Sequence, residues 1–186
     1  MPVDDILLEA DEKMQKSEEH VQHEFASVRT GKASPALVEN VTVDAYGSPM
    51  RLKEVAGITT PEPRMIVIQP WDASTLGSIE KGIQAANIGL NPTVDGKILR
   101  IVIPELSEER RSEFVKLAKK MAEDGRVAVR HVRREAIDNL KKEQKAGDIT
   151  EDELAHGEKE IQKLTDKFTG AIDHHLELKE KEIMTV

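Results

Sequence analysis

Proline placement divides the chain into two kinds of sequence. Seven of the eight prolines lie between residues 35 and 104, and seven of the eleven glycines lie between residues 31 and 105. Residues 3–34 and 105–186 are largely free of these helix breakers, so long helices can continue there without losing backbone hydrogen bonds. The pattern predicts a helical domain of residues 1–30 and 106–186, with a second domain of residues 31–105 inserted into it.

Apolar residues at heptad-like spacing predict three helices in the helical domain. The first covers residues 3–29, with apolar residues every seven positions, and ends at Thr30 and Gly31. The second begins after the N-cap Ser107 and continues for about 38 residues, or about 57 Å. Its expected seam consists of Phe114, Ala118, Met121, Gly125, Ala128, Val132 and Ala136.

The third helix has the clearest start signal, because Thr150 and Glu153 have the spacing of a capping box. Leu154, Ile161 and Phe168 continue it at heptad spacing. Three such helices, two of them long, predict an elongated three-helix bundle.

The inserted domain has a different pattern. Residues 41–46 alternate apolar and polar side chains, and residues 65–68 and 98–103 are apolar runs of strand length. Residues 76–86 between them have helical spacing. We therefore expect a small β/α/β domain and, for the whole chain, an α+β fold.

Composition excludes several functional classes. The absence of cysteine excludes disulfides, thiol catalysis and thiolate metal sites. No apolar run of 18 residues is present, and the N-terminal sequence resembles neither a signal nor a transit peptide, which predicts a cytoplasmic protein without a membrane span. The net charge of −8 argues against general affinity for nucleic acids, although a local basic patch can override it.

Signatures of catalysis and of cofactor binding are missing as well. The sequence has no dinucleotide fingerprint, nucleophile elbow or zinc signature. Gly31 and Lys32 resemble the end of a phosphate loop, but Ala26 and Ala33 stand where that motif needs glycine and a hydroxyl residue. His20 and His23 share one side of a helix, where a solvated face is a simpler interpretation than a metal site. We expect no cofactor, no metal and no enzymatic activity.

Positive charge is concentrated on the second predicted helix. Residues 107–145 contain twelve basic and eight acidic residues, whereas residues 1–30 contain three and eight, and residues 146–186 contain five and eleven. At about 100° per residue, Lys119, Arg126, Arg130 and Arg133 fall within about 60° of arc, with Arg134 beside them. Arg29, Arg110 and Arg111 add three guanidinium groups near one end of the helices.

This arrangement leaves two interpretations open. The basic residues form either a solvated face with bridges to the acidic helices, or a surface that binds phosphate, for which the planar guanidinium is well suited. The chain has only five aromatic residues, so structured RNA held by its backbone suits this surface better than stacked single strands.

The chain resembles the bacterial ribosome recycling factors over essentially all of its length. The resemblance rests on five segments in order along the chain: Arg29–Pro35, Gly89–Pro92, Leu106–Arg111, Arg126–Arg134 and Gln162–Asp166. Two departures are mild. His131 stands where the family commonly has Asn, and Ser107 stands where it commonly has Thr.

The resemblance implies an L-shaped monomer whose long arm is the bundle and whose short arm is the inserted domain. It implies that the bundle binds 23S ribosomal RNA of the large subunit, most clearly through Arg130 and Arg133. It also implies that elongation factor G, using GTP, moves the short arm and splits the post-termination ribosome, which releases mRNA and tRNA. The short arm then needs a hinge, which we expect at Thr30, Gly31, Pro104 and Glu105.

Two other classes compete with this interpretation. The heptads alone would permit an ATP-independent chaperone or a coiled-coil scaffold, which predicts an exposed apolar seam and no salt-sensitive RNA binding. A small hydrolase using the inserted domain would need a nucleophile that the sequence does not offer.

Overall fold

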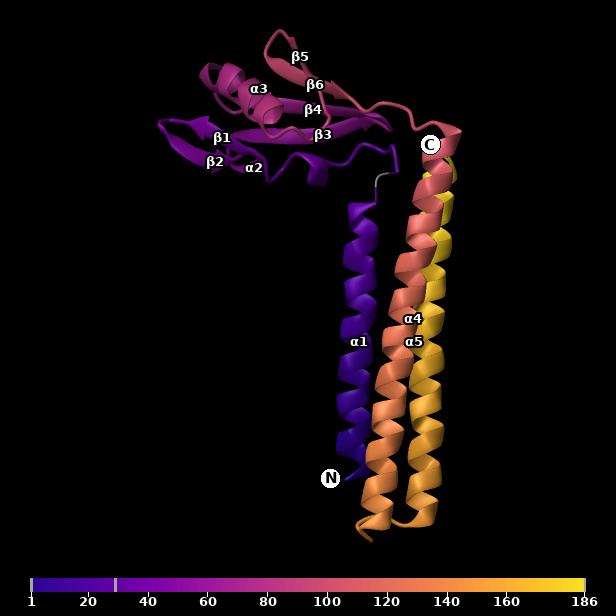
Figure 1. The fold of residues 1–186 in the computed structure, drawn as a ribbon. Helices are drawn as coiled ribbons and strands as arrows, with labels where there is room; N and C mark the ends of the chain where they lie inside the picture. The colour runs from indigo at the N-terminus through magenta and orange to yellow at the C-terminus, as the bar shows by residue number, and fades with distance from the viewer. Residues whose placement is uncertain (1, 29, 186) are drawn as a thin grey trace. The chain divides into compact units, whose positions relative to one another are not determined.

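The computed structural model describes residues 2–28 and 30–185, which form two compact units (Figure 1). Residues 2–28 and 108–185 make a helical unit, and residues 30–107 make a unit of strands and short helices, called here the mixed unit. The unit boundaries lie within two residues of those expected from proline placement.

Three helices make the helical unit, and each packs against the other two (Figure 1). They are α1 (Val3–Ser27), α4 (Glu108–Lys145) and α5 (Glu151–Thr185). The start of α5 has the expected capping box: the backbone N of Thr150 donates to Oε2 of Glu153 at 2.7 Å, and the backbone N of Glu153 donates to Oγ1 of Thr150 at 3.1 Å. The predicted three-helix bundle is confirmed, and α4 has the predicted 38 residues.

The buried seam of α4 differs from the expected one in its middle. Ala122 and Val129 are fully buried, whereas Met121 and Ala128 are only partly buried. The buried positions of α4 are Ala118, Ala122, Gly125, Val129, Val132, Ala136 and Leu140. They advance by four residues more often than by three, so the seam drifts away from a strict seven-residue repeat, as 3.6 residues per turn dictates.

The mixed unit contains a hairpin and a four-stranded sheet. The hairpin joins β1 (Thr42–Ala45) and β2 (Ser48–Arg51), and the antiparallel sheet has the order β3-β4-β6-β5. Its strands are β3 (Ala56–Glu62), β4 (Met65–Pro70), β5 (Pro92–Asp95) and β6 (Ile98–Val102). The helices are η1 (Pro35–Leu37), α2 (Leu52–Val55), η2 (Ala73–Thr75) and α3 (Leu76–Ala85).

One face of this sheet carries the core of the mixed unit. Ile79 and Ile83 of α3 share that core with Ile66 and Ile68 of β4 and with Leu99 of β6, and all five are fully buried. The expected strands correspond to β1, β4 and β6, and the expected helix corresponds to α3, so the small α+β domain is confirmed. Strands β2, β3 and β5 were not predicted.

The two ends of the mixed unit are held by neighbouring residues. The backbone N of Ala33 donates to the carbonyl of Pro63 at 2.7 Å, and the backbone N of Ile103 donates to the carbonyl of Arg64 at 2.8 Å. The connection between β3 and β4 therefore anchors both ends. Gly31, just before the first anchor, has a φ of 77°, a conformation that glycine adopts without strain.

Candidate nucleic-acid interface

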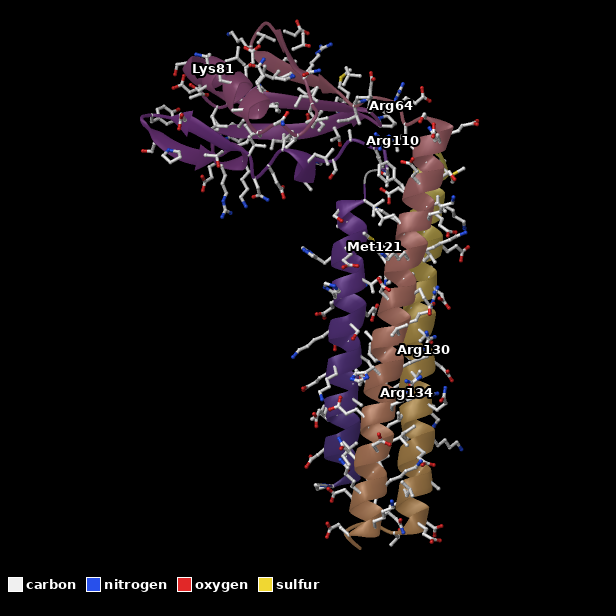
Figure 2. All side chains as sticks on the ribbon, in the orientation of Figure 1. Arg64, Lys81, Arg110, Met121, Arg130 and Arg134 are labelled. Carbon is white, nitrogen blue, oxygen red and sulfur yellow. The ribbon has the colours of Figure 1, made fainter. Side chains whose placement is uncertain are left out.

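Seven of the eight predicted RNA-binding residues lie on α4, and the eighth, Arg29, lies outside the described residues. Figure 2 labels Arg110, Arg130 and Arg134 along this helix. We use the name basic stripe for Lys119, Arg126, Arg130, Arg133 and Arg134. Their surroundings differ, and these differences decide which of them can accept a ligand.

Arg126 is tied to the neighbouring helix. Its Nε and Nη2 lie 2.7 Å and 2.6 Å from Oδ1 of Asp173 on α5, and its Nη1 lies 3.0 Å from Oε2 of Glu123. Only 22% of its side chain is exposed. A guanidinium held by two carboxylates has few donors left, so Arg126 mainly joins α4 to α5.

Arg130 is more accessible. Its Nη2 donates to Oε1 of Glu123 at 2.7 Å, and 39% of its side chain is exposed. Hydrogen bonds from Arg130 and then from Arg126 hold the pKa of Glu123 below its usual range, so this carboxylate stays charged at neutral pH. The planar guanidinium of Arg130 keeps further N–H donors for a ligand.

Arg133 is oriented by a short relay on α5. Its Nη1 donates to Oε1 of Gln162 at 3.0 Å, and Nε2 of Gln162 donates to Oδ1 of Asp166 at 2.9 Å. The Nε of Arg133 is buried without a hydrogen-bond partner among the described residues. The protein therefore satisfies only part of the Arg133 guanidinium, at its Nη1.

The four remaining predicted residues on α4 are Lys119, Arg134 and Arg110, which are exposed, and Arg111, which is partly buried. Arg134 is exposed and has no ion-pair partner in the described part of the chain, and Lys119 is 62% exposed with its Nζ 3.9 Å from Oε1 of Glu180. Arg111 is partly buried, and its Nη1 donates to the carbonyl of Met184 near the end of α5. Arg110 is exposed, and its Nη1 lies 3.6 Å from Oε2 of Glu113.

The stripe therefore borders α5. The structure confirms a bridge to an acidic helix at Arg126, whereas phosphate binding stays a prediction. Arg126 bridges to the acidic helix, whereas Arg130 and Arg134 keep accessible guanidinium groups. Sequence reasoning missed the partners on α5 and Glu123 itself. Glu123 had a readable signal, since it lies three residues before Arg126 and seven before Arg130, which places all three on one face of a helix.

Clusters of metal ligands and membrane-spanning helices are both absent from the described residues. Within residues 2–28 and 30–185, no group of three or more His, Asp or Glu side chains is placed to hold a metal ion. None of the helices described is both long enough and apolar enough to cross a membrane.

Comparison with known proteins decides the family. The family model described as ribosome recycling factor matches residues 21–184. The chain belongs to the ribosome recycling factor family. A ribosome-recycling factor from Caldicellulosiruptor bescii is 54% identical over 177 residues, which cover 95% of this chain and 96% of that protein. The factor from Carboxydothermus hydrogenoformans is 49% identical over 184 residues, covering 99% and 100%.

Solved structures of ribosome recycling factors are similar over nearly the whole chain. A solution structure of the ribosome recycling factor has a TM-score of 0.78 at 44% identity, covering 99% of this chain and 98% of that one. A second structure, described as models for the T. thermophilus ribosome recycling factor and the E. coli elongation factor G bound to the E. coli post-termination complex, has a TM-score of 0.65 at 44% identity, covering 99% and 100%.

Proposed function

We propose that this chain binds 23S ribosomal RNA in the large subunit through the basic stripe. The observation that supports the proposal is that the arginines differ in ion pairing and exposure. Arg126 is paired with Asp173, whereas Arg130 and Arg134 present accessible guanidinium groups on the same helix. Helical segments on either side are acidic, so the stripe is the part of the helical unit that attracts phosphate. The similar ribosome recycling factor that is bound, with elongation factor G, to a post-termination complex supports this assignment.

We further propose that elongation factor G, using GTP, acts on the bound factor through the mixed unit and splits the post-termination ribosome into subunits. The protein then works in the cytoplasm as a monomer without catalysis of its own. The segments around Thr30–Gly31 and Pro104–Glu105 absorb the bending. The left-handed φ of Gly31 and the anchoring of both chain ends at Pro63 and Arg64 support a pivot there.

Sedimentation tests this function directly. Post-termination ribosomes are incubated with the protein, elongation factor G and GTP, and free subunits are measured on a sucrose gradient. We expect subunits only when all three are present, and fewer subunits from the Arg130→Ala variant at a concentration just saturating for the unmodified protein. Intact ribosomes after incubation with the complete mixture would reject the proposal.

A chaperone or scaffold is less well supported. Such a function requires an exposed apolar seam, whereas the seam residues Met14, Val129 and Ile161 are fully buried between the three helices.

A further inference from the structure

One carboxylate in the basic stripe holds two guanidinium groups at once. Oε1 of Glu123 accepts a hydrogen bond from Nη2 of Arg130 at 2.7 Å, and Oε2 accepts one from Nη1 of Arg126 at 3.0 Å. All three residues belong to α4, and the Glu123 side chain is 53% exposed. Arg126 and Arg130 therefore converge on a single two-oxygen anion at the protein surface.

The two arginines depend on Glu123 to different degrees. Arg126 has a second carboxylate, Asp173, which approaches it at 2.6 Å. Arg130 pairs with no carboxylate except Glu123 in the part of the chain that the structure describes. Removing the charge of Glu123 would release Arg130, whereas Asp173 would keep Arg126 in place.

We propose that Glu123 competes with an RNA phosphate for Arg130, and so limits how tightly the basic stripe holds ribosomal RNA. The proposal rests on the function proposed above, because it requires that Arg130 contacts phosphate. Carboxylate and phosphate use the same N–H donors of a guanidinium. When a phosphate binds, Glu123 must give up Nη2 of Arg130 or remain beside a second negative charge.

The opposite role, in which Glu123 positions Arg130 for RNA, predicts weaker binding once its charge is removed. Exposed ion pairs do little to hold long side chains in place. The backbone of Arg130 is already fixed by its position within α4. Repulsion between carboxylate and phosphate therefore outweighs any gain from ordering the arginine. A competing carboxylate also favours release of the factor, which a protein that acts on many ribosomes requires.

The test compares two substitutions that each remove one negative charge from α4. Glu123→Gln keeps the side-chain shape but loses the charge. Glu135→Gln is the matched control, because Glu135 is 44% exposed and its ion pair, with Lys13 at 2.8 Å, involves no arginine of the basic stripe. Each variant is made in the full chain with a dye on one engineered cysteine, and its affinity for purified large ribosomal subunits is measured at several salt concentrations.

We expect Glu123→Gln to bind about two- to fivefold more tightly than the control variant at low salt, the range expected for one exposed ion pair. The gain should shrink as salt rises, because salt screens the competing charge. In an Arg130→Ala background the gain should disappear. Glu123→Ala should behave as Glu123→Gln does, and circular dichroism verifies that each variant keeps its helices.

Two results would overturn the competition while leaving the proposed function intact. In the first, Arg130→Ala weakens binding, but Glu123→Gln binds no more tightly than Glu135→Gln. The other is a gain from Glu123→Gln that persists in full without Arg130. If Arg130→Ala itself binds as tightly as the unmodified protein, Arg130 contacts no phosphate, and both the proposed function of the stripe and this inference fail.

Discussion

A Cβ atom on Gly125 would lie 2.2 Å from Cγ2 of Val21, so α4 and α1 approach each other as closely as a glycine permits. The same atom would lie 3.3 Å from Cδ1 of Ile172 on α5. Val21 is β-branched and sits within a helix, so its side chain has little freedom to move away. Among the glycines of the described helices, Gly125 therefore leaves the least room for a side chain.

We expect Gly125→Ala to lower the free energy of unfolding by about 1–3 kcal/mol, as overpacking does, despite the better helix propensity of alanine. The matched control is Gly170→Ala on α5, where a Cβ meets no atom within 4 Å. That variant should be stabilised by about 0.5–1 kcal/mol. Urea unfolding of both variants gives the comparison, and equal effects at the two glycines would contradict the tight contact.

The arginines of the stripe should separate into structural and binding residues. Arg126→Ala breaks the bridge to Asp173 and should lower stability by up to about 1 kcal/mol, whereas Arg130→Ala should leave the melting temperature nearly unchanged. Arg133→Ala should weaken large-subunit binding with a small loss of stability, since it loses only the bond to Gln162. Thermal unfolding and subunit binding are measured on the same samples, and a stability loss at Arg130 equal to that at Arg126 would contradict the division.

The salt dependence of large-subunit binding should show which arginines contact phosphate. A plot of log affinity for the large subunit against log salt concentration should fall linearly, because bound phosphates release counterions. Arg130→Ala and Arg134→Ala should each reduce the magnitude of the slope by about one. Lys16→Ala removes a charge from an exposed position of α1 and should leave the slope unchanged. Equal slopes for all variants would argue that the stripe makes no phosphate contact.

Acid should weaken the link between α1 and α4. A hydrogen bond from Lys13 holds the pKa of Glu135 below its ordinary value of 4.5. Because the folded-state pKa lies below the unfolded one, this pair stabilises the fold above about pH 4.5 and loses its effect as pH falls through the folded pKa. The free energy of unfolding of Glu135→Gln should therefore fall less steeply between about pH 5 and about pH 3. Urea unfolding across that pH range measures the free energy of unfolding of both proteins. The same pH dependence in Glu135→Gln and in the unmodified protein would contradict the prediction.

A cross-link should separate binding from splitting. The chain has no native cysteine, so pairs can be engineered with one member in residues 30–32 and one in residues 103–105. The oxidised protein, with its disulfide verified by mass, should bind large subunits normally but fail to split ribosomes, and reduction should restore splitting. Full splitting by the oxidised form would mean that bending at these segments is unnecessary.

Proline placement predicted the long helices well and the strands poorly, for the same reason. The three strands that were missed, β2, β3 and β5, contain Pro49, Pro61 and Pro92. In the sequence alone, these prolines indicate an interruption of regular secondary structure. In the sheet, β3 and β5 are the two edge strands, and β2 has only β1 as a neighbour, so a missing N–H can face away from the ladder. Whether a strand is central or at an edge is a property of the sheet, which local pattern does not contain.

The basic stripe was predictable only in part. Its arginines follow from helical periodicity within α4, because their angular positions depend on one helix alone. Their partners Asp173 and Gln162 depend on how α5 aligns with α4, which is set by the packing of both seams. Periodicity therefore identified the cations, but the distinction between the occupied Arg126 and the accessible Arg130 required the assembled bundle.

The interrupted connectivity of the helical unit has a consequence for synthesis on the ribosome. Residues 30–107, the mixed unit, are contiguous and can fold as soon as they emerge. The first helix, α1, packs against α4 and α5, which end more than a hundred residues later. At about 5–20 residues per second, its apolar stripe stays without its full set of partners for roughly 6–30 seconds. Helix α1 is thus made before the mixed unit but reaches its native contacts after it, so its exposed stripe is where a chaperone would bind the nascent chain.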